Sequence, residues 1–196
     1  MKTIETKVYE FDELSDAAKE KAREWYREGA LDYEWWDGVF ESAKTAGACL
    51  GITVDNIYFS GFWSQGDGAC FVGSYAYRKG WRAALQAEFS YEGTIEPTLE
   101  TIGQALQDAQ RPAFYKVTAS VVKGDHRYNH ENTVRIECEP YAVEIDDDVS
   151  AALRDFMRWI YRALEGEYTR LNSDEQVDEA IEANEYTFTA DGERFG

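Results

Sequence analysis

The chain of 196 residues lacks the features that define several common protein classes. Its three cysteines, Cys49, Cys70 and Cys138, stand far apart and form no Cys-x-x-Cys pair, which argues against a disulfide framework and a zinc knuckle. No apolar run approaches the ~18 residues that a membrane span requires, and the N-terminus has no apolar signal-peptide core. We therefore expect a soluble, cytoplasmic protein.

Proline is as scarce as cysteine, and no Ser/Pro-rich linker, internal repeat or low-complexity block interrupts the chain. The sequence has three prolines, and 15% of its residues are aromatic and 44% hydrophobic. A disordered acidic protein would be poor in aromatic residues, whereas this chain has enough to build a core. We predict one domain over residues 1–196.

Basic residues are also too few to balance the acidic ones, and the net charge is −18. Residues 1–41 carry a charge of −6, residues 42–143 carry −2, and residues 144–196 carry −10. Such a field repels nucleic-acid phosphates and attracts basic surfaces. The composition disfavours direct nucleic-acid binding, and it fits either a well-solvated surface or a partner with a basic groove.

The hydrophobic periodicity predicts an α+β fold: an antiparallel sheet from the central region, flanked by N-terminal and C-terminal helices. The strands are expected at 3–10, 52–62, 68–78, 115–124 and 132–145, and residues 186–195 fit either a last strand or an extended tail. Helices are expected within 11–30, 33–51, 98–110, 148–171 and 173–186, with Ser15 or Asp16 and then Ser173 as N-caps. Residues 81–91 fit either a strand or a helix.

A Gly-rich stretch, FSGFWSQGDGACF at 59–71, gathers Ser, Asp and Cys side chains. It lacks the GxSxG pattern and the Gly-Lys-Ser/Thr of a P-loop, so we interpret it as a hairpin with Gly66-Asp67-Gly68 as the turn and Cys70 inside. Trp63 and Gln65, near the tip, are possible partner contacts.

The two histidines, His126 and His130, lie in DHRYNHE at 125–131, which reads as a hairpin tip. Together with Asp125 or Glu131 they could bind a divalent ion, or either could act as a base for Cys70. An exposed polar turn explains the same residues, and we predict no metal site, no cofactor and no catalytic residue.

Acidic residues cluster at two places near the C-terminus. The Asp146–Asp148 run precedes a predicted helix, where negative charge suits the helix dipole. The second cluster forms a charged helix face, and carboxylates along a helix can take the place of phosphates in a cationic groove. The candidate partner-binding residues are Asp146, Asp147, Asp174, Glu175, Asp178, Glu179, Glu182 and Glu185.

Three blocks of the sequence resemble one family over nearly the full length: YEFDELSDAAKEKAREWYREGALDYEWWD, DNIYFSGFWSQGDGACF and LRDFMRWIYRALEGEYTRLNSDEQVDEAIEANEYTFTADGER. The family consists of small acidic proteins encoded by tailed bacteriophages and prophages, often labelled "antitoxin of toxin–antitoxin stability system". The resemblance implies a phage accessory protein that is made inside a bacterial cell and counters host defence or modulates host machinery.

The expected function is therefore that of a non-enzymatic inhibitor. Its partner would be a host protein with a basic surface, most plausibly a nucleic-acid-handling defence complex of the CRISPR or restriction type, bound through the acidic helices. Two alternatives stay open: an antitoxin-like neutraliser of a basic toxin, and a small-ligand sponge or enzyme using Cys70 with His126 and His130. The sequence leaves the oligomeric state undetermined.

Overall fold

The computed structural model describes residues 5–140 and 143–196 of the chain. The chain divides into two compact units. Unit 1 comprises residues 1–35 and 166–196, and unit 2 comprises residues 36–165. The expectation of one domain concerns independent folding, and it stays a prediction.

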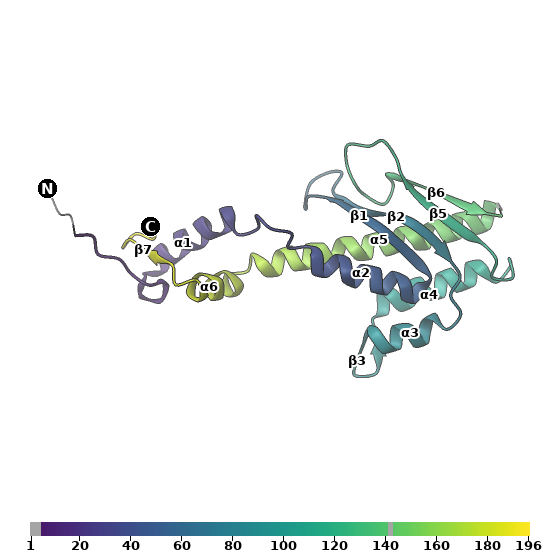
Figure 1. The fold of residues 1–196 in the computed structure, drawn as a ribbon, viewed down its shortest axis with the longest axis horizontal. Helices are drawn as coiled ribbons and strands as arrows, with labels where there is room; N and C mark the ends of the chain where they lie inside the picture. Colours follow the sequence, from purple (N-terminus) through teal and green to yellow (C-terminus); the bar gives the residue numbers. More distant parts are fainter. Residues whose placement is uncertain (1–4, 141–142) are drawn as a thin grey trace. The chain divides into compact units, whose positions relative to one another are not determined.

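Unit 2 is built on a four-stranded antiparallel sheet with the strand order β1-β2-β5-β6 (Figure 1). The strands are β1 (Ile52–Ser60), β2 (Gly68–Ala76), β5 (Thr118–Lys123) and β6 (Val134–Glu139). Each comes from the central region of the chain, as the alternation of β-branched and aromatic residues predicts. With the helices that flank this sheet, the α+β fold class is confirmed.

The helices of unit 2 are α2 (Asp37–Leu50), α3 (Trp81–Glu88), α4 (Pro97–Gln110) and the first part of α5 (Val143–Leu171), which supplies residues up to Glu165. Phe71 of β2 packs edge-to-face on Phe156 of α5, with ring centroids 5.8 Å apart. Side chains alternate across a strand, so Phe71 and its same-face neighbours belong to the core beneath the helices.

Residues 81–91, ambiguous in the sequence, form α3 and the strand β3 (Ser90–Tyr91), which pairs with β4 (Thr94–Ile95). The helix is selected by packing, because Trp81 is buried and its indole donates to Gln107 Oε1 of α4 over 3.0 Å. Gly103 of α4 is required at this contact, since a Cβ there would lie 2.4 Å from the Trp81 ring.

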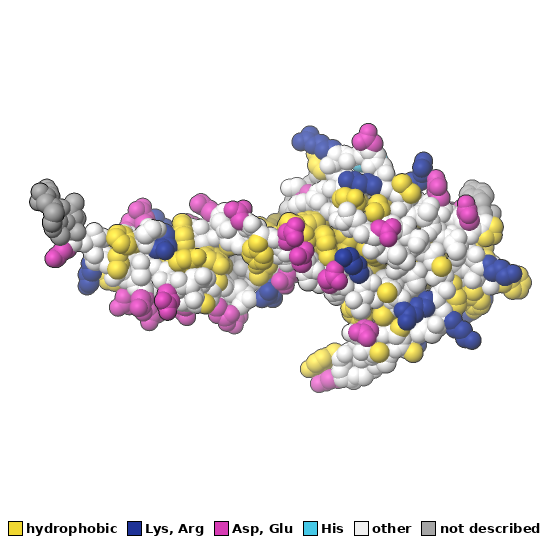
Figure 2. Space-filling view, viewed as in Figure 1, with side chains coloured by type: hydrophobic (Ala, Val, Ile, Leu, Met, Phe, Trp, Pro, Cys, Tyr) yellow, Lys and Arg dark blue, Asp and Glu magenta, His cyan; other side chains and the backbone are white. Residues whose placement is uncertain are grey.

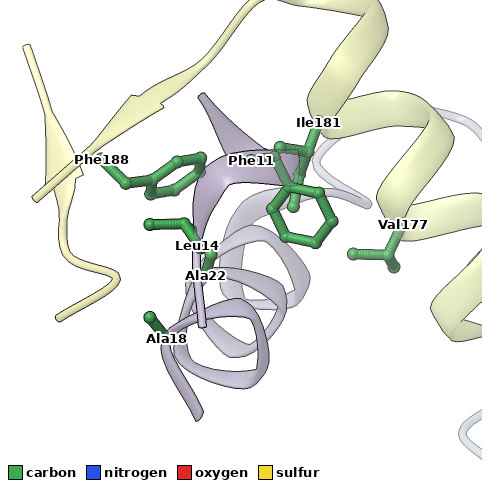
Figure 3. Packing of buried hydrophobic residues seen from close by; sticks show 7 residues of the cluster. All are labelled: Phe11, Leu14, Ala18, Ala22, Val177, Ile181 and Phe188. Carbon is green, nitrogen blue, oxygen red and sulfur yellow. The ribbon is translucent and has the colours of Figure 1, made fainter. Parts of the chain in front are cut away.

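Unit 1 contains η1 (Phe11–Glu13), α1 (Asp16–Gly29), the end of α5, α6 (Asp174–Ala183), β7 (Thr187–Phe188) and β8 (Arg194–Phe195). Ser15 and Ser173 cap α1 and α6 as predicted, because their hydroxyls accept from Ala18 N and Gln176 N. Figure 3 shows the small core between these elements. Its buried residues are Phe11, Leu14, Ala18, Ala22, Val177, Ile181 and Phe188.

The structure corrects the predicted elements at three places. Within residues 5–10 only Tyr9 pairs, in a single bridge to Phe188, and residues 1–4 lie outside the described chain. Residues 186–195, predicted as a last strand or an extended tail, contain a short β7–β8 hairpin. The predicted strand 132–145 ends at Glu139, because Pro140 has no N–H to donate to a ladder, and α5 begins at Val143 rather than 148.

Candidate functional site

Acidic side chains are concentrated in unit 1. Its 66 residues hold 19 acidic and 8 basic residues, for a net charge of −11, whereas the 130 residues of unit 2 carry −7. Figure 2 shows acidic side chains gathered over α6. Unit 1 is therefore where a cationic partner would meet the strongest attraction.

Helix α6 divides into an apolar and an acidic face. Val177 and Ile181 are fully buried against α1 and Phe188, so the side chains between them point elsewhere. Asp174, Glu175, Glu179, Glu182 and Glu185 are exposed, and Asp178 is half-buried. The structure thus brings six of the eight candidate acidic residues together on one helix and the residues next to it.

Two of these six carboxylates hold unit 1 together. The Arg23 guanidinium of α1 donates two hydrogen bonds of 2.7 Å to the two carboxylate oxygens of Asp178. Arg27 donates to Asp174 Oδ1 and to the carbonyl of Asn172. These pairs leave less of the Asp174 and Asp178 charge for a partner, and the place of the two residues in a partner-binding surface stays a prediction.

The other carboxylates of α6 face solvent. Glu179 accepts a hydrogen bond from Gln176 of the same helix. Within residues 5–140 and 143–196, no Lys, Arg or His forms an ion pair with Glu175, Glu182 or Glu185. The charges of these three side chains, and that of Glu179, whose Gln176 donor is neutral, remain available to a cation from outside.

Glu182 and Glu185 also line a hollow in unit 1, which we call the acidic hollow. Its other lining residues are Glu10, Phe11, Asp12, Tyr186 and Thr187, and its volume is about 660 Å³. The last turn of α6 contains no basic residue. Carboxylates at the negative end of a helix dipole, close to further carboxylates, do not stabilise the fold, so folding alone does not explain this arrangement.

Asp146 and Asp147 belong to unit 2, in the first part of α5 rather than ahead of it as the sequence predicted. Asp147 is exposed, whereas Asp146 is half-buried. Burial raises the pKa of the Cys138 thiol to about 11, and its hydrogen bond to Asp146 acts in the same direction. Asp146 therefore has a role within unit 2.

The Gly-rich stretch is a β1–β2 hairpin, as predicted, with Ser60 opposite Gly68. The turn comprises residues 64–67 rather than the predicted Gly66-Asp67-Gly68. Asp67 N donates to Ser64 O over 3.2 Å, and the Asp67 carboxylate accepts from Ser64 N over 2.7 Å. The two partner-contact candidates, Trp63 and Gln65, are both exposed, and Trp63 is 69% exposed.

The glycines of this hairpin let another loop approach closely. A Cβ at Gly68 would lie 2.4 Å from the His130 Cβ, and one at Gly66 would lie 3.3 Å from the Tyr128 ring. Asn129 N also donates to Ser60 Oγ over 2.8 Å. The structure therefore brings the histidine-containing loop onto the Gly-rich hairpin, a contact that the sequence did not predict.

Cys70 is fully buried at this contact, on the sheet face opposite Phe71. Its sulfur accepts a hydrogen bond of 3.8 Å from the Thr133 hydroxyl, and burial raises the pKa of the thiol. Nucleophilic cysteines need a lowered pKa and exposure, so the geometry disfavours catalysis at Cys70. The His130 imidazole instead accepts from Asn132 N, and His126 is exposed.

Two features are absent from the described residues, 5–140 and 143–196. These residues contain no group of three His, Cys, Asp or Glu side chains placed to hold a metal ion. They also contain no helix that is both long enough and apolar enough to cross a membrane.

Comparison with known proteins gives one match, to a family model over residues 35–174. No curated protein and no solved structure matches the chain. The matched range contains all of unit 2 and ends at the first residue of α6. The acidic hollow lies outside it. Because the family model matches most of the chain, the chain belongs to the family described as a domain of unknown function, DUF8835.

Proposed function

We propose that the chain is a non-enzymatic accessory protein of a tailed bacteriophage or prophage that acts in the cytoplasm of the bacterial host. It binds and inhibits a host nucleic-acid-handling defence complex, of the kind that anti-CRISPR or anti-restriction proteins target. The phage origin rests on the resemblance of the three sequence blocks.

The observation that carries the proposal is the division of the α6 carboxylates into two groups. Asp174 and Asp178 form hydrogen-bonded ion pairs with arginines of α1, and these pairs neutralise the two carboxylates within unit 1. Among the described residues, Glu175, Glu182 and Glu185 have no such cation. The unmatched carboxylates are complementary to a surface rich in Lys and Arg.

Nucleic-acid-binding proteins present such surfaces, because they neutralise phosphates with Lys and Arg. A carboxylate surface that occupies the same groove competes with the nucleic acid, and its binding weakens as salt screens the charges. The proposal therefore predicts inhibition by competition, with a steep dependence on ionic strength.

The experiment compares charge reversal at unmatched and at unrelated positions. Glu175→Lys, Glu182→Lys and Glu185→Lys together change the α6 surface without touching the Arg23 and Arg27 pairs. The matched control reverses three exposed acids of unit 2, Asp55, Glu88 and Asp125, which gives the same net charge. Loss of partner binding in the first variant alone supports the proposal, and equal binding by both contradicts it.

An antitoxin-like role would use the same acidic surface against a small basic toxin. The identity of the protein that co-purifies from host cells distinguishes the two. A multi-subunit complex that handles nucleic acid supports the defence-inhibitor proposal, and a single small basic protein supports the antitoxin alternative.

A further inference from the structure

Strand β6 forms one edge of the unit 2 sheet. Among the described residues it pairs with β5 alone, and Lys123 and Val134 are opposite each other at the start of the ladder. Gly124 N donates to Thr133 O over 3.0 Å, just beyond that pair. In an antiparallel ladder, hydrogen-bonded and non-hydrogen-bonded pairs alternate. The N–H and C=O groups of Val134, Ile136 and Cys138 therefore point away from β5, toward the free edge.

The opposite edge of the sheet is protected in a way that β6 is not. Strand β1 has a bulge between Val54 and Asn56, where Asp55 has no opposite residue. A bulge in an edge strand discourages pairing with another chain. The register of β6 with β5 is continuous over all six residues, so β6 is regular enough to accept a further strand.

The sequence of β6, Val134-Arg-Ile-Glu-Cys138, is complementary to itself when read antiparallel. We propose that a second copy of this chain pairs with β6 about a two-fold axis at Ile136. Ile136 then lies opposite Ile136 of the partner subunit, and Val134 lies opposite the partner subunit's Cys138. Arg135 lies opposite the partner subunit's Glu137, twice by symmetry. The result is a continuous eight-stranded sheet.

The backbone and the charges select the same register. Pairing about Ile136 places residues with outward N–H and C=O groups opposite each other, as an antiparallel ladder requires. Shifting the axis to Arg135 or Glu137 also satisfies the backbone, but it puts two like charges face to face, which is unfavourable. Arg135 and Glu137 are 73% and 55% exposed and lie 2.8 Å apart on one strand, so both can reach across the axis.

Sedimentation equilibrium of the full chain in 0.15 M salt tests the proposal. The salt limits the repulsion between two acidic chains, since the screening length is then ~8 Å. We expect a concentration-dependent dimer. Arg135→Glu or Glu137→Arg alone places like charges opposite each other and weakens the dimer by about tenfold or more. The double variant, R135E with E137R, restores attraction in both pairs and recovers the wild-type affinity.

Each outcome decides for or against the proposal. Circular dichroism of the single variants confirms that the fold is intact, since both side chains are exposed. A chain that stays monomeric up to about 1 mM contradicts the proposal, because a β6–β6 dimer would be populated at such concentrations. A dimer that both single variants leave unchanged, or that the double variant fails to restore, also contradicts it.

Discussion

Arg23 and Asp178 form a bidentate pair that joins α1 to α6, with both nitrogen–oxygen distances at 2.7 Å. Their side chains are 18% and 28% exposed, so water screens the pair only in part. The hydrogen bonds to Asp178 are the main reason that the pKa of Arg23 is raised. The pair sets the position of α6, and with it the direction of the carboxylates that we assign to the partner surface.

A double-mutant cycle tests this pair. Arg23→Gln and Asp178→Asn should each lower the free energy of opening α6 by about 1–3 kcal/mol, because each leaves a charge without its partner. The double variant should lose less than the sum. Hydrogen exchange of the α6 amides is the measurement, since it reports on unit 1 alone. Additive losses would contradict a direct coupling.

The N-cap of α6 gives a second prediction. Ser173→Ala removes the hydroxyl that accepts from Gln176 N and should lower the stability of α6 by about 1 kcal/mol. Ser173→Asp is the matched control, because an aspartate caps a helix and suits the dipole. Hydrogen exchange in the first turn of α6 should increase in the alanine variant only. An equal increase in both variants would show that capping is not the cause.

The buried Cys138 thiol makes the stability of unit 2 depend on alkaline pH. Burial raises its pKa to about 11, above the value of ~8.5 in an unfolded chain. The unfolded state therefore loses its proton first, so stability is constant below pH ~8.5 and falls as the pH rises toward 11. Burial also raises the pKa of Tyr75 to about 12, which continues the loss at higher pH.

Urea unfolding between pH 7 and 11, followed by a probe in unit 2, measures this effect. Cys138 should contribute a loss of roughly 2–3 kcal/mol near pH 11, on the scale of 1.36 kcal/mol for each pKa unit. Cys138→Ala removes this group and should make the loss smaller between pH 8.5 and 10, although the raised pKa values of Cys49 and Cys70 leave a residual slope. A wild-type profile as flat as that of the alanine variant would contradict the assignment.

All three thiols should resist modification in the native protein. Cys49, Cys70 and Cys138 are buried, and burial raises the pKa of each. Iodoacetamide at pH 8 should therefore label none of them until denaturant is added, as mass spectrometry can show. Rapid native labelling of Cys70 would revive the alternative of a reactive site at the hairpin, and Cys70→Ser should otherwise leave partner binding unchanged.

The sequence predicts the fold well where pattern alone determines an element. The apolar stripe of α5 and the caps Ser15 and Ser173 are local signals, and the structure confirms them. Residues 81–91 were ambiguous because their helix depends on Trp81 packing against α4, a contact that no local pattern reveals. In the described part of the strand expected at 3–10, residues 5–10, only Tyr9 has a strand partner, Phe188, so the alternation does not make a ladder.

The site was predicted less completely, because it depends on pairing between distant segments. Arg23 and Arg27 are four residues apart on α1, as are Asp174 and Asp178 on α6, and such spacing places each pair on one helix face. The equal spacing of the two arginines and the two aspartates is a local signal that these helix faces meet. The contact was not among the predictions from the sequence. Glu10 and Asp12 gave no signal, since only the tertiary structure brings them to the hollow beside Glu182.

The central claim is that the unmatched α6 carboxylates bind a basic surface of a host defence complex. Affinity purification from host lysate during infection tests it most directly, with wild type, the Glu175/Glu182/Glu185→Lys variant and the Asp55/Glu88/Asp125→Lys control as baits. We expect wild type and control to retain a nucleic-acid-handling complex that salt elutes, and the α6 variant to lose it. Equal recovery of that complex by the α6 variant would contradict the account.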